Sequence, residues 1–199
     1  MAGLLFVVAA PSGAGKTTLV RRLLAKTPEI ALSVSTTTRP PRAGEMEGRD
    51  YHFVSAPEFL ARRDAGEFLE WAKVHDNFYG TSKRWIEEKQ ARGEDVLLEI
   101  DWQGAAQVRR FFPEAVGIFI LPPSQKILAE RLFSRGTDSD EVIRRRLAAA
   151  EEEIRHAAEF DYAIINADLE MALADFSAIV KAARLTVARQ RARYPELFV

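Results

Sequence analysis

The sequence predicts an α/β fold with a mostly parallel sheet, and three observations support this prediction. Five short apolar runs have the pattern of buried strands, and they span residues 4–9, 31–35, 95–100, 116–121 and 161–166. Helical patterns separate most of these runs, and a glycine-rich turn directly follows the first one. Such alternation is typical of a parallel sheet, here of five strands, that is flanked by helices.

The expected helices follow from apolar residues at helical spacing between the strand-like runs. They cover residues 16–26, 82–92, 103–112, 124–134, 140–159 and 168–193. The first of them stops before Pro28, which is a common signal for the end of a helix.

Two regions interrupt the alternation. Residues 35–84 combine a polar loop with short aromatic-rich runs around an amphipathic helix at 57–65, which predicts a small mixed α/β insertion with its own antiparallel strands. Residues 122–159 form an arginine-rich helical pair, and such charge runs are usually solvated helical faces. No repeat or linker divides the chain, so one domain over 1–199 is predicted. Its core comprises residues 1–34, 85–121 and 160–199.

Composition excludes several functional classes. The formal net charge is −1, so no overall field attracts nucleic acid or an anionic membrane. The absence of cysteine excludes disulfides and thiol chemistry, and His52, His75 and His156 show no metal-ligand spacing. The apolar start lacks a basic n-region, and no run reaches the ~18 apolar residues of a membrane span. We therefore expect a cytoplasmic protein without a nucleic-acid or membrane partner.

The stretch AAPSGAGKTT at 9–18 predicts a phosphate-binding loop of the P-loop type, G-x-x-x-x-G-K-[ST]. Its glycines let backbone N–H groups point at phosphate oxygens, and the helix that follows adds its own N-terminal donors. Lys16 is expected to reach the β- and γ-phosphates, and Thr17 to join the shell of a Mg²⁺ ion. Ala10 replaces the first glycine, but we expect the two later glycines to carry the left-handed backbone. The predicted phosphate contacts are Ser12, Gly13, Ala14, Gly15, Lys16, Thr17 and Thr18.

A second phosphate site is predicted in the insertion. Arg39 and Arg42 lie on a proline-stiffened loop, and two forked guanidinium groups a few residues apart suit a phosphate. Tyr51 and Tyr79 can add hydroxyl donors. The runs FLEW and NFYG would serve equally well as core strands, because aromatic residues are core residues first. Glu70 stands out, since strand alternation puts it opposite its apolar neighbours.

Several blocks together resemble the guanylate kinase family over essentially the whole chain. They are APSGAGKTT, SVSTTTRPPRAGEMEGRDYHFV, FLEWAKVHDNFYGTS, DVLLEIDWQGA and FILPPS. The resemblance implies a P-loop NTPase fold and the phosphorylation of GMP by ATP, with Mg²⁺, to give GDP and ADP. It also places Ala10 within the pattern of the family, whose loop commonly begins with glycine or alanine.

The resemblance assigns acceptor roles residue by residue. It implies that the GMP phosphate is bound by Arg39, Arg42, Tyr51 and Tyr79, and that guanine is read by Ser35, Glu70 and Thr81, with Glu45 as support. Gly80 belongs to the same expected GMP-binding set. The chemistry agrees, because a carboxylate such as Glu70 can accept both adjacent donors of guanine. Adenine would instead present an acceptor to the carboxylate, and such unpaired contacts can reduce turnover by ~10⁴. Nothing visible reads the 2′-hydroxyl, so dGMP is also expected as a substrate.

One position departs from the family pattern. Glu99 stands where the family usually has aspartate, on the guanine side, and the extra methylene puts its hydrogen bond in question. Asp101 ends the same strand-like run and is our candidate, with Thr17, for support of Mg²⁺.

The arginine-rich region resembles the lid of the family. Arg131 and Arg135, one helical turn apart, match positions around ATP, and Arg146 matches the arginine that reaches the transferred phosphoryl group. Asn166 matches a position beside adenine. We expect Lys16 together with Arg39, Arg135 and Arg146 to stabilise the transfer, because phosphoryl transfer depends on positioning and positive charge.

Two alternatives remain open at this stage. The same fold can serve as a scaffold module that binds phosphorylated peptides. Such modules typically lose the residues of the lid and of the phosphate-binding loop at 9–18, called the cradle below, which are present here. A P-loop kinase of another nucleoside monophosphate is the second alternative, and the set of guanine-reading residues argues against it. The sequence leaves open whether the chain is a monomer or a homo-oligomer.

Overall fold

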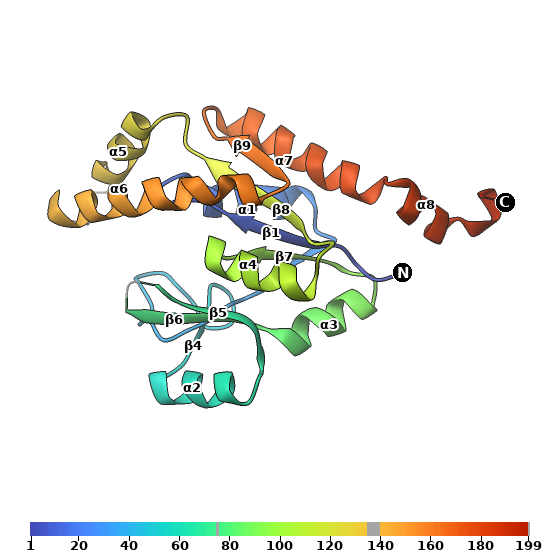
Figure 1. Cartoon of the computed structure of the whole chain (residues 1–199), viewed down its shortest axis with the longest axis horizontal. Coiled ribbons are helices and arrows are strands. Elements are labelled where there is room, and N and C mark those ends of the chain that lie inside the picture. Colours follow the sequence, from blue (N-terminus) through green and yellow to red (C-terminus); the bar gives the residue numbers. More distant parts are fainter. Residues whose placement is uncertain (75, 135–139, 199) are drawn as a thin grey trace.

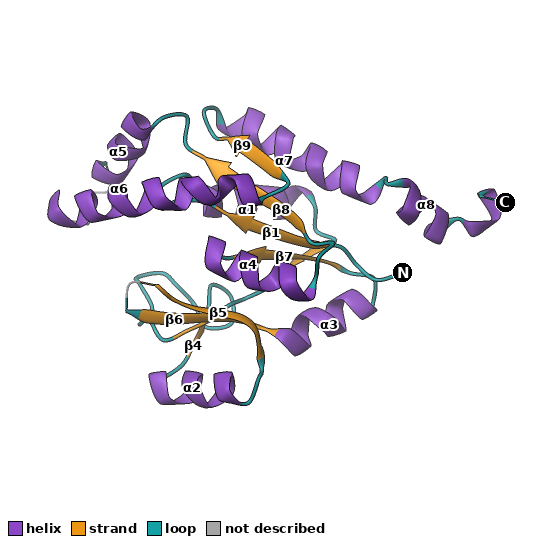
Figure 2. Ribbon diagram, viewed as in Figure 1, coloured by secondary structure: helices purple, strands orange, loops and turns teal. Residues whose placement is uncertain are grey.

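A computed structural model describes residues 1–74, 76–134 and 140–198 of the chain (Figure 1). Its central sheet has the strand order β2-β7-β1-β8-β9, and every neighbouring pair is parallel. These strands are β1 (Leu5–Ala9), β2 (Ile30–Leu32), β7 (Asp95–Glu99), β8 (Val116–Leu121) and β9 (Tyr162–Ile165). The predicted parallel five-stranded sheet is therefore confirmed, and its strands and flanking helices are distinguished in Figure 2.

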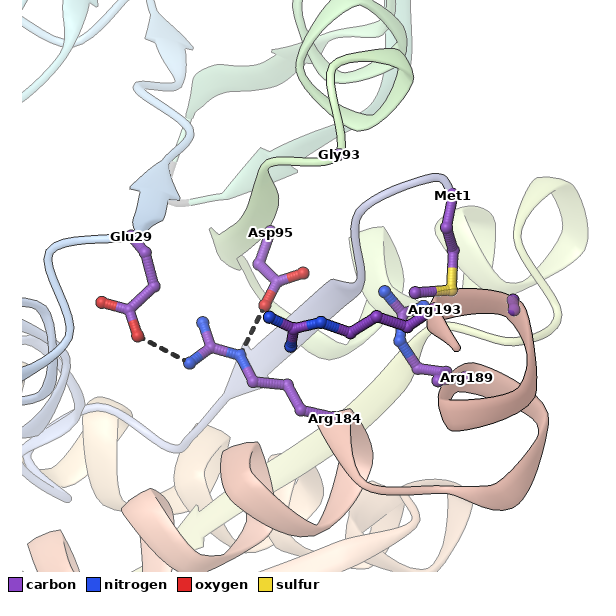
Figure 3. A pocket seen from close by; sticks show the side chains of 8 residues that line it. Met1, Glu29, Gly93, Asp95, Arg184, Arg189 and Arg193 are labelled. Carbon is purple, nitrogen blue, oxygen red and sulfur yellow. Dashed lines mark hydrogen bonds and ion pairs between the residues drawn. The ribbon is translucent and has the colours of Figure 1, made fainter. Parts of the chain in front are cut away.

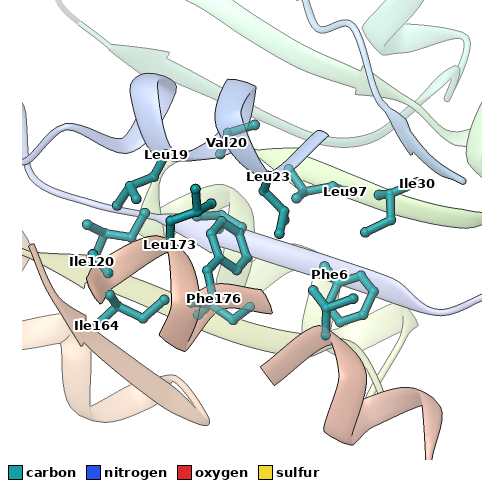
Figure 4. Close-up of a cluster of buried hydrophobic side chains, with 14 of the residues drawn as sticks. Phe6, Leu19, Val20, Leu23, Ile30, Leu97, Ile120, Ile164, Leu173 and Phe176 are labelled. Atoms are coloured by element: carbon teal, nitrogen blue, oxygen red, sulfur yellow. The ribbon is translucent and has the colours of Figure 1, made fainter. Parts of the chain in front are cut away.

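Two hydrophobic clusters cover the two faces of this sheet. Alternate residues of β1 enter opposite clusters: Phe6 and Val8 join one, whereas Leu5 and Val7 join the other. The first cluster includes α1 (Lys16–Lys26) and α7 (Leu169–Arg184), and Figure 4 shows Phe176 of α7 among its side chains. The second includes α3 (Lys83–Ala91) and α4 (Trp102–Phe111). Each fully buried large side chain contributes roughly 1.5–3 kcal/mol, so burial on both faces explains why β1 is apolar throughout.

Three predicted elements differ from the structure by more than one residue at an end. The strand expected at 31–35 is β2, Ile30–Leu32, because the chain then leaves the sheet for the insertion. The helix expected at 140–159 is α6 (Asp140–Arg155), which is followed by a 3₁₀ turn, His156–Glu159. The prediction of a single helix over 168–193 is wrong.

The long C-terminal helix is interrupted at Leu185 and Thr186. The chain instead forms α7 and a separate α8 (Val187–Arg193), and a further 3₁₀ turn, Pro195–Leu197, follows. Thr186 has the extended backbone of an N-cap, and Leu185 and Val187 are 55% and 68% exposed. Apolar periodicity therefore continues past the point where the core ends, and without packing the helix has little reason to continue.

The insertion forms a second sheet with the order β4-β3-β6-β5. Its elements are β3 (Thr36–Thr37), β4 (His52–Phe53), α2 (Ala56–Asp64), β5 (Phe68–Val74) and β6 (Asn77–Ser82). The expectation of antiparallel strands holds for β3–β6 and β5–β6, but β3 and β4 are parallel. Phe59 of α2 stacks on Phe68 and Phe78, with ring centroids 4.6 and 5.4 Å away, which gives this small sheet its own aromatic core.

The helices of the predicted lid region are α5 (Gln125–Phe133) and α6, and they pack through a small apolar cluster. Its buried members are Leu128, Leu132, Ile143 and Ala150. Among the described residues, no helix is long and apolar enough to cross a membrane.

Candidate active site

The cradle joins β1 to α1 at the carboxyl edge of the parallel sheet, where open α/β sheets bind their ligands. Gly13 and Gly15 both have a φ of +93°, which a residue with a side chain rarely adopts. Asp76 is the only residue other than glycine with a positive φ in the described part of the chain. Ala10 therefore needs no left-handed backbone, and its methyl group packs beside the main core cluster.

Lys16 crosses the carboxyl edge of the sheet. Its Nζ donates a hydrogen bond of 2.9 Å to the carbonyl oxygen of Ile100, at the end of β7. The ammonium group is therefore held over the cradle by a residue 84 positions away in the sequence.

A cavity of about 340 Å³ extends from the cradle to the insertion. It is lined on the cradle side by Ser12, Gly13, Gly15, Lys16, Thr17 and Thr18, and on the insertion side by Ser35, Arg42, Tyr51, Glu70 and Tyr79. The two phosphate sites predicted separately thus open into one cavity, with Glu99, Asp101 and Arg146 along its walls.

Glu70 is a buried carboxyl group in that cavity, with 4% of its surface exposed. Thr81 donates a hydrogen bond of 2.5 Å from its Oγ1 to Oε1 of Glu70, while a Cβ atom at Gly104 would lie 2.5 Å from Oε2. Burial raises the pKa of Glu70 from 4.5 to about 7, with a smaller contribution in the same direction from Asp101. Gly104, which was not predicted from the sequence, is therefore needed to make room for this carboxyl group.

The alternation expected around Glu70 holds toward Trp71, because Glu70, Ala72 and Val74 line the cavity and Trp71 does not, but it is interrupted before Glu70. β5 has a register shift between Phe68 and Glu70, and regular alternation would place Phe68 and Trp71 on opposite faces. Both instead approach the aromatic core beside α2: Phe68 stacks on Phe59, and Trp71 lies 6.2 Å from Phe78. The bulge therefore lets Glu70 face the cavity.

Arg39 and Glu45 form an ion pair at the rim of the insertion. Nη2 of Arg39 donates to both carboxylate oxygens of Glu45, at 2.8 and 2.9 Å, and the backbone N–H of Arg42 donates to the same carboxylate at 2.7 Å. These hydrogen bonds, that of Arg39 first, lower the pKa of Glu45. The guanidinium carbon of Arg39 lies 5.3 Å from the centre of the Tyr51 ring. In this arrangement Glu45 orients Arg39, and Arg42 is among the residues that line the cavity whereas Arg39 is not.

Thr17, Glu99 and Asp101 supply the oxygen atoms that a magnesium ion would need. Oγ1 of Thr17 donates to Oε1 of Glu99 over 2.5 Å, so the longer side chain of Glu99 reaches the cradle. Asp101 caps α4 by accepting from the N–H of Gly104 at 2.7 Å, and it also lines the cavity. No group of three or more acidic or histidine ligands occurs among the described residues. This donor set fits Mg²⁺, which is usually held by one or two carboxylates together with phosphate and water.

The lid approaches the cradle through several polar contacts. Arg131 of α5 donates to the carbonyl oxygens of Ala14 and Asn166, at 3.5 and 3.0 Å. Asn166 is buried and donates to the Ala14 carbonyl at 2.7 Å, so both side chains support the cradle from behind. Arg146 of α6 donates to Oγ of Ser12 at 3.0 Å. The prediction for Arg135 lies outside the described residues.

Glu153 was not predicted from the sequence, yet it lines the cavity from α6. Its Oε2 accepts a hydrogen bond of 3.3 Å from the backbone N–H of Ser12. Burial raises the pKa of Glu153, and Asp101 adds to this increase, whereas the Ser12 hydrogen bond and the charge of Lys16 lower it. Glu153 follows Arg146 by seven residues, or two helical turns, and this spacing in the sequence could have indicated that both side chains share one face of the helix.

A cavity of about 640 Å³ lies near the amino ends of the central strands, whereas the cradle follows the carboxyl end of β1. Figure 3 shows the side chains that line this cavity. Arg184 dominates it, and its Nε and Nη1 donate to Asp95 at 2.7 Å and to Glu29 at 2.8 Å. Arg189 also lines this cavity and donates to the carbonyl oxygen of Ala2. These contacts join the C-terminal helices to the start of the chain. We therefore interpret the polar residues that line this cavity as stabilising the fold.

Comparison with known proteins decides the family. The family model described as guanylate kinase matches residues 3–183 of this chain. The chain belongs to the guanylate kinase family. The guanylate kinases of Dechloromonas aromatica and Aromatoleum aromaticum are 63% and 59% identical to it over 198 residues, which is 100% of this chain and 98% and 97% of theirs.

Solved structures agree with this membership of the guanylate kinase family. The crystal structure of guanylate kinase from Anaplasma phagocytophilum has a TM-score of 0.80 and 36% sequence identity, and the match covers 94% of this chain and 89% of that one. Shikimate kinase from Bacteroides thetaiotaomicron has a TM-score of 0.51 at 17% identity, so it shares only the fold. The family predicted from the motifs is thus confirmed.

Proposed function

We propose that this chain transfers the γ-phosphoryl group of ATP to GMP, and also to dGMP, to form ADP and the corresponding diphosphate. One observation carries the proposal: the cradle with Lys16 and the insertion with Glu70 open into the same cavity. A donor and an acceptor nucleotide can therefore meet without leaving the protein. The guanylate kinase relatives at 63% and 59% identity support this choice of substrates.

On the acceptor side, the proposal assigns guanine to Glu70. Its carboxylate, once ionised, can accept from both adjacent donors of guanine, while Thr81 holds it from the other side. Tyr51 lines the same cavity, and burial raises the pKa of its hydroxyl, which keeps this group a hydrogen-bond donor at neutral pH. Arg42 lies close enough to the cavity to bind the GMP phosphate.

On the donor side, the N–H groups of the cradle and Lys16 bind the phosphates, and Arg146 supplies positive charge from the lid. Arg39 and Arg135 complete the proposed set of cationic groups. Thr17 and Asp101 would hold a magnesium ion, with Glu99 beside Thr17, and that ion would neutralise charge on the phosphates. Approach of the lid and insertion would exclude water and so favour transfer over hydrolysis. Every residue in this proposal belongs to one chain, and the cytoplasm is its proposed location.

The proposal is tested by coupled ADP-release assays with GMP, AMP, CMP and dTMP in parallel. We expect rapid ADP release with GMP and little with the other three. Activity with none of the four would favour the scaffold alternative, and equal activity with AMP would contradict the role given to Glu70.

Lys16→Ala provides the second test of the same reaction. We expect kcat/KM for GMP to fall by at least about 10²–10³-fold, because the variant loses a positive charge at the transferred phosphates. Its thermal unfolding should stay cooperative, since the variant loses one part-buried side-chain hydrogen bond, to Ile100, and no apolar core contact. Near-normal GMP-dependent ATP consumption in this variant would contradict the proposed site.

A further inference from the structure

Two side chains of opposite charge on the lid helix α6 make hydrogen bonds to Ser12 of the phosphate cradle. Arg146 donates to the hydroxyl oxygen of Ser12 at 3.0 Å, and Glu153 accepts from its backbone N–H at 3.3 Å. Seven residues separate Arg146 from Glu153, so both project from one face of the helix. Ile143 and Ala150, each three positions before one of these residues, belong to the apolar cluster that α6 shares with α5. Neighbouring stripes on one side of the helix therefore carry the cradle contact and the packing of α6 on α5.

The Glu153 contact is unusual because of where the carboxylate lies. Backbone N–H groups of a P-loop bind phosphate oxygens, and here one of them, that of Ser12, is bound by an oxygen of a carboxylate. Lys16, the residue expected to bind the β- and γ-phosphates, attracts the same carboxylate. A carboxylate and a phosphate are both oxygen anions, so they suit the same donors.

The Glu153 carboxylate and the phosphates of ATP cannot both lie beside the Ser12 N–H without strong electrostatic repulsion. Asp101 already repels Glu153 across the cavity, and burial disfavours its charged form. A triphosphate in the cradle would add several negative charges within a partly buried site, where repulsion is screened less than at the surface. Displacement of the carboxylate would also remove one of the two contacts that hold α6 on Ser12.

We propose that Glu153 is a positioning residue of the triphosphate site: its carboxylate occupies the Ser12 N–H until the phosphates of ATP displace it. This inference rests on the proposed function only in taking the cradle as the ATP site. Displacement releases α6 from the backbone of the cradle while Arg146 stays beside Ser12, so ATP binding itself prepares the lid to move. The carboxylate thereby weakens ATP binding and couples it to the position of the lid.

The test is the affinity of Glu153→Gln for ATP, measured by isothermal titration calorimetry without GMP. Glutamine keeps the shape and an oxygen acceptor for the Ser12 N–H but removes the charge. We expect ATP to bind about tenfold more tightly than to the unmodified chain, a change that corresponds to about 1.4 kcal/mol. A gain in affinity cannot arise from a damaged fold, so it separates this role from a purely structural one.

Glu151→Gln is the matched control, because Glu151 lies on the same helix, is exposed, and loses the same charge. Its ATP affinity should stay within about twofold of the unmodified chain, given the small effect of exposed charges. If Glu153→Gln does not fold, Glu153→Ala replaces it with the same expected direction. Unchanged or weaker ATP binding by the Glu153 variant overturns the inference alone, whereas failure of the unmodified chain to bind ATP overturns the proposed function as well.

Discussion

Among the described residues, Glu70 shows most clearly how a single side chain can serve a site at the expense of the fold. It is buried beside Gly104, and burial raises its pKa to about 7. The ionised form that the proposed contact with guanine needs is thus the form that the free protein disfavours. Binding of two guanine donors would replace the water that this carboxylate has lost.

Glu70→Gln should change both the stability of the fold and the selectivity for GMP over AMP. A carboxyl group whose folded pKa is raised contributes stability that is fully present below about pH 4.5 and is lost as pH rises through about 7. The variant should therefore match the unmodified chain near pH 4.5 and exceed it by about 3 kcal/mol at pH 8, as measured by urea unfolding. In assays at pH 8 it should lose selectivity for GMP over AMP. Equal stability at both pH values would contradict the buried charge, and unchanged selectivity would contradict its role.

At the scale of elements, α4 is the helix that connects Asp101, a proposed magnesium ligand, to Glu70, the proposed guanine reader. Asp101 caps its N-terminus, and Gly104 in its first turn lies against Oε2 of Glu70. β5 reaches the same place through its bulge. Helix cap, helix glycine and strand bulge are thus three local features that together make space for one carboxyl group.

Gly104→Ala tests this packing. Alanine usually stabilises a helix interior by about 0.4–1 kcal/mol relative to glycine. Here its Cβ would lie 2.5 Å from the Glu70 carboxylate, so we expect a net loss of about 1–3 kcal/mol and a KM for GMP raised at least about tenfold. Calorimetric ATP affinity should not change.

Glu70→Ala provides the background that isolates the clash. In that background, Gly104→Ala should become neutral or stabilising, because the carboxylate that it would meet is gone. A stability loss of equal size in both backgrounds would show that the glycine is required for a different reason.

At the scale of the whole molecule, the ends of the chain are tied together far from the catalytic edge. Arg184, the last residue of α7, bonds to Asp95 at the start of β7 and to Glu29 before β2. Asp95 also accepts the backbone N–H of Leu4 at 2.7 Å. One guanidinium group therefore links three segments at the amino ends of the central strands.

Arg184→Leu should cost about 3–5 kcal/mol in urea unfolding, because the buried carboxylate of Asp95 loses its cationic partner. Its kcat for GMP at low temperature should remain near that of the unmodified chain, since the site lies at the opposite ends of the strands. Lys181→Leu removes the same charge from an exposed position one turn earlier and should stay within about 0.5 kcal/mol. Equal stability of the two variants would refute the structural role of Arg184.

The sequence by itself determined the succession of the central strands and helices along the chain, the phosphate-binding loop and the family. These depend on local patterns: a buried parallel strand is a continuous apolar run, and a P-loop is a short contiguous motif. The same local reasoning predicted nucleotide contacts for Glu70, Arg42 and Lys16, and the structure brings these three residues to one cavity. It failed where periodicity continued beyond the core, as at Leu185, and it did not predict the bulge between Phe68 and Glu70.

Only the tertiary structure decided which distant residues share the site. The Lys16 contact with Ile100, the Thr17 contact with Glu99 and the Ser12 contact with Glu153 span 84, 82 and 141 positions. No local pattern encodes such pairs, because they arise when parallel strands bring their carboxyl ends to one edge and the lid folds back over it. The same packing made Gly104 necessary and gave Glu70 its raised pKa, since burial is a property of the whole fold.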